Sequence, residues 1–170
     1  LSDGNVHSNI KHLIAMLKEA KASGVKKVRC HIMLDGRDVP ATSALTYVSE
    51  LEAVLASLND DTFDGMIASG GGRMKITMDR YQANWKMVEE GWHTHVLGEG
   101  RQFADATSAI EAYRSEIAGI IDQDLPAFVI AKDGEPVGKI VDNDSVVLFN
   151  FRGDRAIEIS MAFDQEDFDK

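Results

Sequence analysis

The fold is decided by residues 28–40, Val28-Arg-Cys-His-Ile-Met-Leu-Asp-Gly-Arg-Asp-Val-Pro40. In the first seven residues, apolar side chains alternate with others, which is the period of a β-strand with one buried face. The Asp35-Gly36-Arg37-Asp38 segment breaks this alternation, because glycine and aspartate favour turns. The stretch therefore predicts a strand that ends in a loop presenting a cation and a carboxylate side by side.

Helical periodicity lies on both sides of this strand. Before it, apolar residues recur at helical spacing from Ile10 to Leu17, and Gly24 stands where a C-terminal cap belongs. After it, a second stripe from Leu45 to Leu55 predicts another helix. The predicted helices cover residues 6–22, the stripe 45–55, and residues 78–90, 104–117 and 155–163. Further strands are predicted at residues 65–69, 93–97, 127–131, 136–141 and 146–151.

The order of these elements predicts an α/β fold. Strands and helices of these lengths alternate as they do in a three-layer αβα sandwich with a mostly parallel sheet. Near the end of the chain, the Lys132-Asp133-Gly134-Glu135 turn predicts a C-terminal hairpin. No repeat or linker interrupts the pattern, so we expect residues 1–170 to form a single domain.

Composition restricts the classes of partner. The chain has 170 residues and a formal net charge of −10, which argues against nucleic acid and anionic membranes as partners, because both need a basic surface. No apolar run is long enough to cross a membrane, and Cys30 is the only cysteine. We therefore expect a cytoplasmic protein. Because the chain starts at Leu1 on a dense motif, we expect it to be a piece of a longer protein.

The arginines indicate where a ligand would bind. Five of the eight fall at predicted junctions between strands or helices and loops: Arg37, Arg73, Arg80, Arg152 and Arg155. Such junctions gather at the carboxyl ends of parallel strands, where ligands of open α/β sheets bind. A guanidinium group binds carboxylate or phosphate oxygens in bidentate fashion, so converging arginines predict a site for a small polyanion. The alternative is that each arginine pairs with a surface acid.

Two roles are open for the loop after the first strand. Arg37 can hold an anion while Asp38 accepts and returns a hydroxyl proton. Alternatively, Asp38 caps the helix that starts near Ala41, and Arg37 pairs with Asp38.

Three further features remain ambiguous. The Ser69-Gly70-Gly71-Gly72-Arg73 run can cradle phosphate or form a tight turn, but it lacks the endings of known phosphate loops. His7 can face an anion at a helix N-terminus or simply pack there. His93 and His95 would share one face of a strand, and we interpret them as structural because no further ligand accompanies them.

Taken together, eight segments resemble the cofactor-independent phosphoglycerate mutases, which work without 2,3-bisphosphoglycerate. The segments are Leu1-Ser-Asp-Gly-Asn-Val-His7-Ser8, Leu34-Asp-Gly-Arg-Asp38, Gly72-Arg73, Met78-Asp-Arg80-Tyr81, Trp85, Val96-Leu-Gly-Glu-Gly100, Leu125-Pro-Ala-Phe-Val-Ile130 and Asn150-Phe-Arg-Gly-Asp-Arg155. The Ser69-Gly-Gly-Gly-Arg-Met74 and Asp79-Arg-Tyr81 motifs are similar to the plant and trypanosomatid branch. The resemblance extends over nearly the whole chain.

The resemblance implies a glycolytic isomerase with two domains. Residues 1–170 would be most of the inserted transferase domain, which binds 3-phosphoglycerate and 2-phosphoglycerate. The missing phosphatase domain would carry the nucleophilic serine and two divalent metals (manganese, cobalt or magnesium). We therefore expect no metal and no activity in this fragment alone, and a monomeric complete enzyme. The alternative from another class is a non-catalytic module that binds phosphosugars or organic acids.

The resemblance also implies roles for particular residues. Those that match the family's substrate-binding positions are His7, Arg37, Asp38, Arg73, Arg80, Arg152 and Arg155. Asp38 matches the catalytic residue that moves a proton between the glycerate hydroxyls. Two departures from the family pattern stand out. Asn5 replaces a usual glycine, and Arg73 and Arg80 are seven residues apart where many bacterial members have six.

Overall fold

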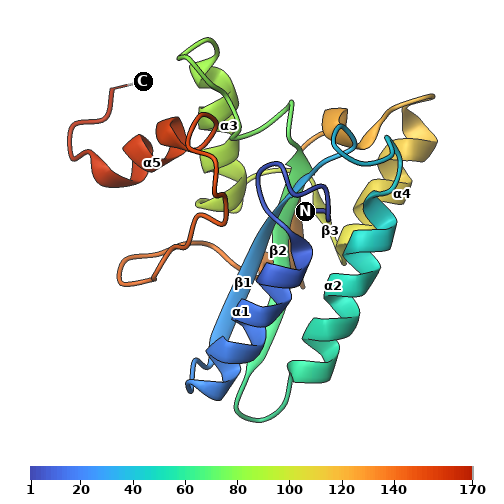
Figure 1. The fold of residues 1–170 in the computed structure, drawn as a ribbon, viewed down its shortest axis with the longest axis vertical. Coiled ribbons are helices and arrows are strands. Elements are labelled where there is room, and N and C mark those ends of the chain that lie inside the picture. Colours follow the sequence, from blue (N-terminus) through green and yellow to red (C-terminus); the bar gives the residue numbers. More distant parts are fainter. Residues whose placement is uncertain (170) are drawn as a thin grey trace.

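A mixed β-sheet lies at the centre of the molecule, in a computed structural model that describes residues 1–169 (Figure 1). Its strands are β1 (Lys27–Leu34), β2 (Asp64–Gly72), β3 (Gln102–Phe103), β4 (Phe128–Lys132) and β5 (Glu135–Pro136). They are ordered β1-β2-β4-β3, and β5 pairs with β4. β1 is parallel to β2 and β3 is parallel to β4, whereas β4 runs antiparallel to β2.

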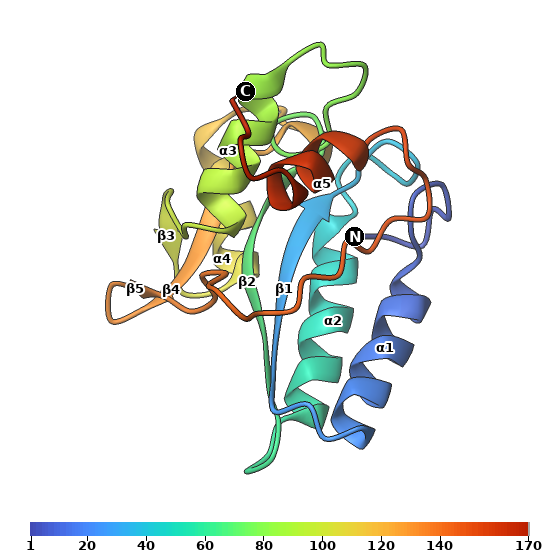
Figure 2. The same cartoon turned by 90° about the vertical axis from the view of Figure 1, so that its left-hand side faces the viewer.

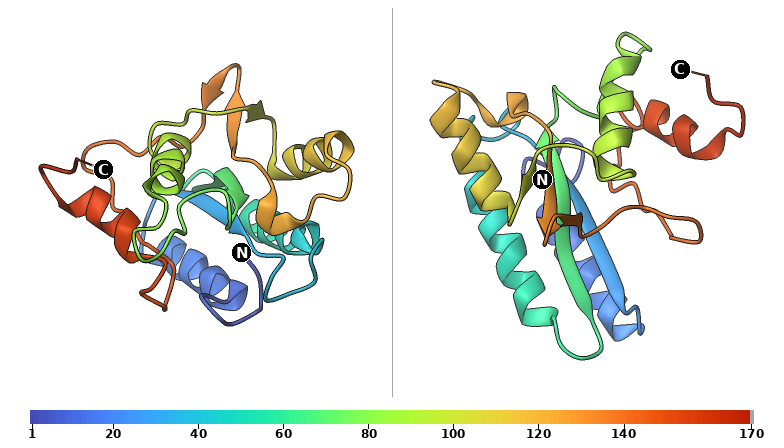
Figure 3. Two further views of the ribbon diagram at one scale, coloured as in Figure 1. Left: turned by 90° about the horizontal axis from the view of Figure 1, so that it is seen from above. Right: turned by 180° about the vertical axis from the view of Figure 1, so that it is seen from behind.

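Helices cover both faces of this sheet, which confirms the predicted α/β class (Figures 2 and 3). The helices are α1 (Ile10–Ala22), α2 (Ala44–Leu58), α3 (Trp85–His95), α4 (Ala106–Glu116) and α5 (Ile157–Asp164), with a short 3-10 turn, η1 (Asp122–Asp124). α1, α2 and α4 pack on one face, whereas α3 packs on the other with α5 beside it. Of the segments in residues 1–169, no helix combines the length and apolarity that crossing a bilayer requires.

The decisive strand forms as predicted. Cys30, Ile32 and Leu34 are buried in the main core against Val48 and Leu51 of α2. The intervening residues of β1 face the side of the sheet on which α3 lies. The alternation of the sequence thus separates the core face of β1 from a more polar face, because successive side chains of a strand point to opposite sides.

The glycine run belongs to β2 and does not form a turn. The strand continues to Gly72. The positions are glycine because neighbouring backbone and rings come too close to leave room for a side chain. A Cβ atom on Gly72 would lie 2.3 Å from the Gln123 carbonyl oxygen, and one on Gly70 would lie 2.5 Å from the Phe128 ring. Both phosphate binding by a loop and a tight turn are therefore wrong for this segment.

The predicted hairpin is present but short. β4 and β5 pair across residues 132–135, and β5 has two residues where a strand over 136–141 is predicted. The strand predicted at 146–151 does not form, because this apolar run pairs with no strand of the described part of the chain.

The sequence pattern predicts the third helix at residues 78–90, which are the wrong bounds. The structure has a loop at residues 78–84 and α3 from Trp85 to His95, so the predicted strand at 93–97 is wrong. Gly91 is the reason, because it suggests a helix end. In the structure the helix runs through it, and a Cβ atom there would lie 2.2 Å from Thr77 Oγ1. The glycine therefore permits close packing of α3 against the preceding loop.

The first helix starts later than predicted. Asn9 caps α1 by accepting from Lys11 N at 2.9 Å, so His7 lies in the loop before it. Asn5 in this loop has a φ of 56°, a left-handed conformation that glycine adopts most easily and asparagine tolerates. Asparagine at this position therefore adopts a turn conformation that glycine also favours.

Candidate anion-binding site

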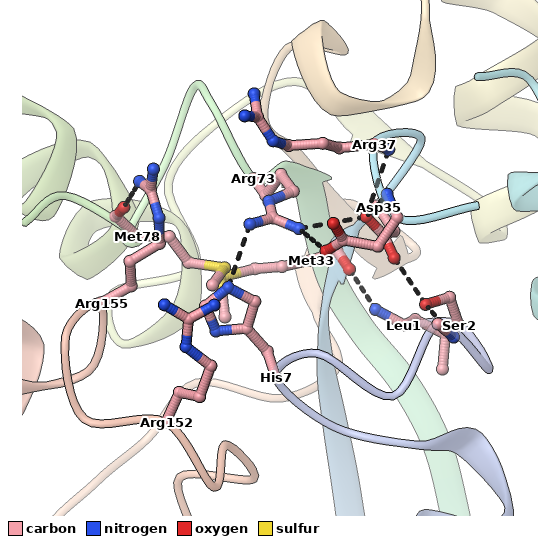
Figure 4. A network of polar contacts seen from close by, with 12 residues as sticks. Leu1, Ser2, His7, Met33, Asp35, Arg37, Arg73, Met78, Arg152 and Arg155 are labelled. Atoms are coloured by element: carbon pink, nitrogen blue, oxygen red, sulfur yellow. Dashed lines mark hydrogen bonds and ion pairs between the residues drawn. The ribbon is translucent and has the colours of Figure 1, made fainter. Parts of the chain in front are cut away.

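The predicted site residues lie at the carboxyl ends of β1 and β2, where Figure 4 shows His7, Arg37, Arg73, Arg152 and Arg155 close together. Arg80 approaches the same region through its ion pair with Asp154. Four chain segments contribute to this region. Two are loops, at residues 35–38 after β1 and 73–80 after β2, and two are the segments that precede α1 and α5, at residues 1–9 and 150–156. The convergence follows from topology, because parallel strands bring their carboxyl ends to one edge of the sheet.

Arg73 is at the centre of the site. Its guanidinium is buried and donates to Asp38 Oδ2 at 2.6 Å and to Asp35 Oδ1 at 3.1 Å. The other terminal nitrogen lies 3.1 Å from His7 Nε2. One planar cation thus joins the loops after two strands to the segment before α1.

Asp35 is a site residue that the sequence reasoning missed. Its carboxylate accepts from Ser2 Oγ at 2.6 Å and from the backbone N–H groups of Arg37 and Asp38 at 3.2 and 3.1 Å. Although burial opposes the charge, these hydrogen bonds and Arg73 hold the pKa of Asp35 below its usual value. Asp35 therefore fixes the shape of the loop that carries Arg37 and Asp38.

His7 enters the site as a neutral imidazole. Because the Arg73 guanidinium can only donate, His7 Nε2 accepts and carries no proton. Burial, followed by the charges of Arg73 and Arg152, lowers the pKa of His7. Its carbonyl oxygen accepts from Phe151 N at 2.8 Å, which ties the segment before α1 to the one before α5.

Two arginines share one acid. Arg152 donates to Asp154 Oδ2 at 2.9 Å, and Arg80 lies 3.7 Å from the same oxygen. Arg80 also stacks over the exposed Tyr81 ring, with 5.1 Å between the guanidinium carbon and the ring centroid. Asp154 thus keeps two cations side by side although their charges repel each other.

Arg155 shows most directly that the arginines converge. It donates to the Met78 carbonyl oxygen at 2.7 Å, which brings it against the loop after β2. Its pKa is lowered by burial first and then by the charges of Arg80, Arg73 and Arg37. A guanidinium group whose pKa is lowered by the charges of three other arginines lies in a region of positive potential.

Arg37 and Asp38 do not form the pair that the alternative prediction requires. The Arg37 guanidinium is exposed and has no hydrogen bond or ion pair within residues 1–169, whereas Asp38 pairs with Arg73. Asp38 does not cap the next helix either. The acceptor at the start of α2 is Asp122, whose Oδ2 atom accepts a hydrogen bond from Ala44 N at 2.7 Å.

A buried histidine pair lies on the α3 face of the sheet. Ser69 Oγ is 2.7 Å from His31 Nδ1 and 2.7 Å from His95 Nδ1. Desolvation lowers the pKa of His31 to about 4 and that of His95 to about 3, so both rings are neutral. His95 is a packing residue, as predicted, but it projects from a helix and not from a strand.

Metal binding does not suit the described residues. No group of three or more His, Cys, Asp or Glu side chains within residues 1–169 could hold an ion. The site itself is dominated by guanidinium groups, whose charge repels a divalent cation. The chemistry that this arrangement supports is the binding of a small anion.

Fold and site together define an α/β domain that collects arginines at one edge of its sheet. The whole chain, residues 1–170, matches the family model described as the N-terminus of BPG-independent PGAM. The chain therefore belongs to the family of 2,3-bisphosphoglycerate-independent phosphoglycerate mutases.

Similar proteins come from bacteria, trypanosomatids and plants. The chain is 61% identical to a probable 2,3-bisphosphoglycerate-independent phosphoglycerate mutase of Leptospira interrogans, over 99% of the chain and 31% of that protein. It is 54% identical to the enzyme of that name in Trypanosoma brucei brucei, over 100% of the chain and 31% of that protein.

A solved structure supports the fold. The chain superimposes with a TM-score of 0.98 on Leishmania mexicana phosphoglycerate mutase, whose crystal structures were determined at low cobalt concentration. The two are 47% identical in sequence over 100% of this chain and 31% of the other. The chain thus spans about a third of the length of the relatives it matches.

Proposed function

We propose that this chain is the substrate-binding transferase domain of a cofactor-independent phosphoglycerate mutase, an isomerase that interconverts 3-phosphoglycerate and 2-phosphoglycerate. The observation that carries the proposal is the convergence of five arginines around one end of the sheet. The guanidinium groups of three of them, Arg73, Arg80 and Arg155, themselves make a hydrogen bond or an ion pair to a neighbouring site segment.

The charges suit the substrate. Phosphoglycerate carries a carboxylate and a phosphate, about three negative charges, and guanidinium groups bind both in bidentate fashion. Arg37 is exposed and free within the described residues, while Arg80 and Arg152 are held side by side by Asp154. These three groups can bind the ligand while the buried Arg73 stays paired with Asp35 and Asp38. Fixed cations hold glycerate in position while the phosphoryl group leaves and returns.

Asp38 has the geometry of a proton carrier. Its Oδ2 atom is held by Arg73 at 2.6 Å, whereas Oδ1 makes no hydrogen bond with residues 1–169. In the proposed reaction, once the phosphoryl group has left the glycerate, the Asp38 carboxylate takes a proton from the hydroxyl that will attack phosphorus. It passes this proton to the glycerate oxygen that the phosphoryl group left, which restores the carboxylate.

The remaining chemistry belongs to another part of the complete enzyme. We propose that a phosphatase domain outside this chain forms the phosphoserine intermediate and carries the two divalent metals (manganese, cobalt or magnesium). A divalent metal there would stabilise charge on the transferring phosphoryl group. This chain contributes binding, orientation and the proton transfer at Asp38, and we propose that it has no mutase activity alone.

Substrate binding tests the proposal directly. We expect Arg152→Ala combined with Arg155→Ala to weaken 3-phosphoglycerate binding at least about 100-fold in calorimetry, because two charge-assisted contacts are lost. The control is Arg101→Ala, which removes an exposed arginine paired with Glu116 at 2.6 Å. Unchanged affinity in the double variant would contradict the anion site.

The proton transfer has its own test in the complete enzyme. Asp38→Asn keeps an oxygen that can accept from Arg73 but cannot carry the proton. We expect this variant to form phosphoserine and to lose isomerisation. If both steps survive, Asp38 is not the proton carrier. If the unmodified complete protein binds phosphoglycerate without any turnover, the chain is a binding module instead.

A further inference from the structure

We propose that Glu158 and Asp79 form a buried carboxyl pair sharing one proton, and that this pair positions Arg80 for substrate. Glu158 lies on α5, and Asp79 lies in the loop that precedes α3. We call this loop, residues 77–84, the Arg80 loop. Glu158 is then a positioning residue that acts through Arg80. The inference rests on the proposed function for what Arg80 binds, but the pair itself can be tested separately.

The Arg80 loop needs support from outside. Three of its residues that are not glycine have positive φ angles: Thr77 at 69°, Tyr81 at 62° and Gln82 at 56°. Side chains with a Cβ atom disfavour this conformation, so such a loop persists only where surrounding contacts determine it. Two of the three positions directly follow Arg80, so the direction of its side chain depends on those contacts.

The two carboxyl groups supply contacts on either side of Arg80. Glu158 Oε1 accepts from Gln82 N at 2.9 Å, and Asp79 Oδ2 accepts from Asn84 N at 2.6 Å. Glu158 therefore binds the loop backbone at one of its left-handed residues. Asp79 closes the same loop from within, because its acceptor lies five residues before the donor.

A shared proton explains the burial of both acids. Asp79 is 6% exposed and Glu158 is 4% exposed. Glu158 Oε2 is fully buried and has no hydrogen-bond donor among the described residues, and the carboxyl group of Glu158 interacts with that of Asp79. Two ionised carboxylates there would repel each other, whereas one protonated group donates to the other.

The pKa shifts of the two groups agree with this arrangement. Burial, followed by interaction with Asp79, raises the pKa of Glu158, against the opposing Gln82 hydrogen bond. Backbone N–H groups and Glu158 lower the pKa of Asp79 although burial opposes them. The two shifts have opposite directions, so Glu158 is the group of the pair that binds a proton more readily.

The pair acts on the same junction as the arginines. Arg155, three residues before Glu158, donates to the Met78 carbonyl next to Asp79, and Arg80 reaches Asp154. The segment before α5 and the Arg80 loop are thus joined at three places. Two of these three contacts use an arginine side chain, and the contact made by the carboxyl pair does not. The pair can therefore hold the loop when the guanidinium groups turn toward a ligand.

Three variants of the complete enzyme test the proposal. Glu158→Ala removes both contacts, whereas Glu158→Gln keeps an acceptor for Gln82 N and gains an N–H donor toward Asp79. The matched control is Glu111→Gln on the exposed surface of α4. The readouts are the KM and kcat for 3-phosphoglycerate, tryptic cleavage after Arg80, and the infrared difference spectrum of wild type minus Glu158→Gln.

We expect Glu158→Ala to raise KM at least about tenfold, with a smaller change in kcat, and to expose Arg80 to trypsin. Glu158→Gln and Glu111→Gln keep both properties near wild type. The difference spectrum shows the C=O stretch of one protonated carboxyl group at neutral pH. Absence of that band, or a Glu158→Ala variant with wild-type KM and trypsin resistance, overturns the proposal.

Failure of the proposed function gives a different result. If the wild type does not bind 3-phosphoglycerate, the mutase proposal falls. The infrared band and the trypsin pattern then still decide whether the carboxyl pair holds the loop, because neither depends on substrate.

Discussion

Asp35 and Arg73 depend on each other. The Arg73 side chain is 7% exposed and that of Asp35 is 9% exposed, so their ion pair is buried. A buried cation that loses its partner is costly, since neither water nor another charge replaces it. Asp38 also contacts Arg73, but its side chain is more exposed, at 19%. Asp35 is therefore the more buried of the two carboxylates that pair with Arg73, and the carboxylate of Asp38 is the more accessible one.

We expect Asp35→Ala to destabilise the folded chain by about 3 kcal/mol, because it removes the more buried of the two carboxylates that pair with Arg73 and the acceptor of two loop N–H groups. Urea denaturation monitored by circular dichroism measures the loss. Asp35→Asn should cost much less, since the amide oxygen can still accept. The exposed Asp61→Ala serves as the control, and equal stability of Asp35→Ala and this control would contradict the role of Asp35.

Individual site residues differed in how far the sequence could predict them. Arg37 and Arg73 stand directly after strands, so their position alone predicted a place at the sheet edge. Asp35, Asp154 and Glu158 carry no comparable signal, because acids are common in this chain and their partners lie far away in sequence. Their importance became visible only when the fold showed which cation or backbone N–H each one faces.

At the scale of elements, the histidine pair links β1, β2 and α3. His31 projects from β1, Ser69 from β2 and His95 from α3, with 5.4 Å between the two ring centroids. Each ring is neutral when folded, and burial, nearly complete for His95 and partial for His31, disfavours a charge on either ring. The contact therefore makes the packing of α3 on the sheet sensitive to acid.

Stability should fall as the pH drops below about 6.5, the pKa of an unfolded histidine. The unfolded chain then binds protons, whereas folded His31 and His95 remain neutral down to about 4 and about 3. Each histidine contributes a slope of about 1.4 kcal/mol per pH unit in that range, and none above pH 7.

Urea denaturation at pH 7.5, 6 and 5 checks this dependence. His95→Gln should reduce the slope that the pair contributes, because one of the two titrating groups is lost. His12→Gln, at an exposed position of α1, is the control. Identical slopes for wild type and His95→Gln would show that the pair does not govern acid stability.

Elements with strong periodicity were predictable, and those shaped by distant contacts were not. The apolar stripe of α2 and the alternation of β1 predicted the first and last residues of both elements to within a few residues. Gly91 misled the prediction, because its role is to admit Thr77 and no local pattern reports that contact. The strand expected at 146–151 failed since an apolar run needs a free sheet edge beside it, which its sequence does not encode.

For the whole molecule, net charge and site charge have opposite signs. The chain carries −10 overall, yet Arg37, Arg73, Arg152 and Arg155 lie close together (Figure 4). Arg80 is near them, because it shares Asp154 with Arg152. Local charges decide binding here, because salt screens exposed acids farther away than about 8–10 Å at ordinary ionic strength. An acidic protein can therefore bind a small anion tightly.

Ligand binding should stabilise the fold, because the site joins segments from separate parts of the chain. At 100 times its dissociation constant, 3-phosphoglycerate should add about 2.7 kcal/mol to the free energy of unfolding. Differential scanning fluorimetry with increasing 3-phosphoglycerate measures the shift in melting temperature. Glycerol at equal concentration is the uncharged control. A melting temperature that is equal with both would contradict specific binding.

The hydrogen bond from Phe151 N to the His7 carbonyl has a consequence for synthesis on the ribosome. Phe151 is translated long after His7. The helices α1 and α2 and the β1–β2 pair can form before Phe151 is made, whereas the link between the two site segments cannot. The region where the arginines gather is thus completed later than the elements that support it, and a chain that stops before Phe151 lacks this link.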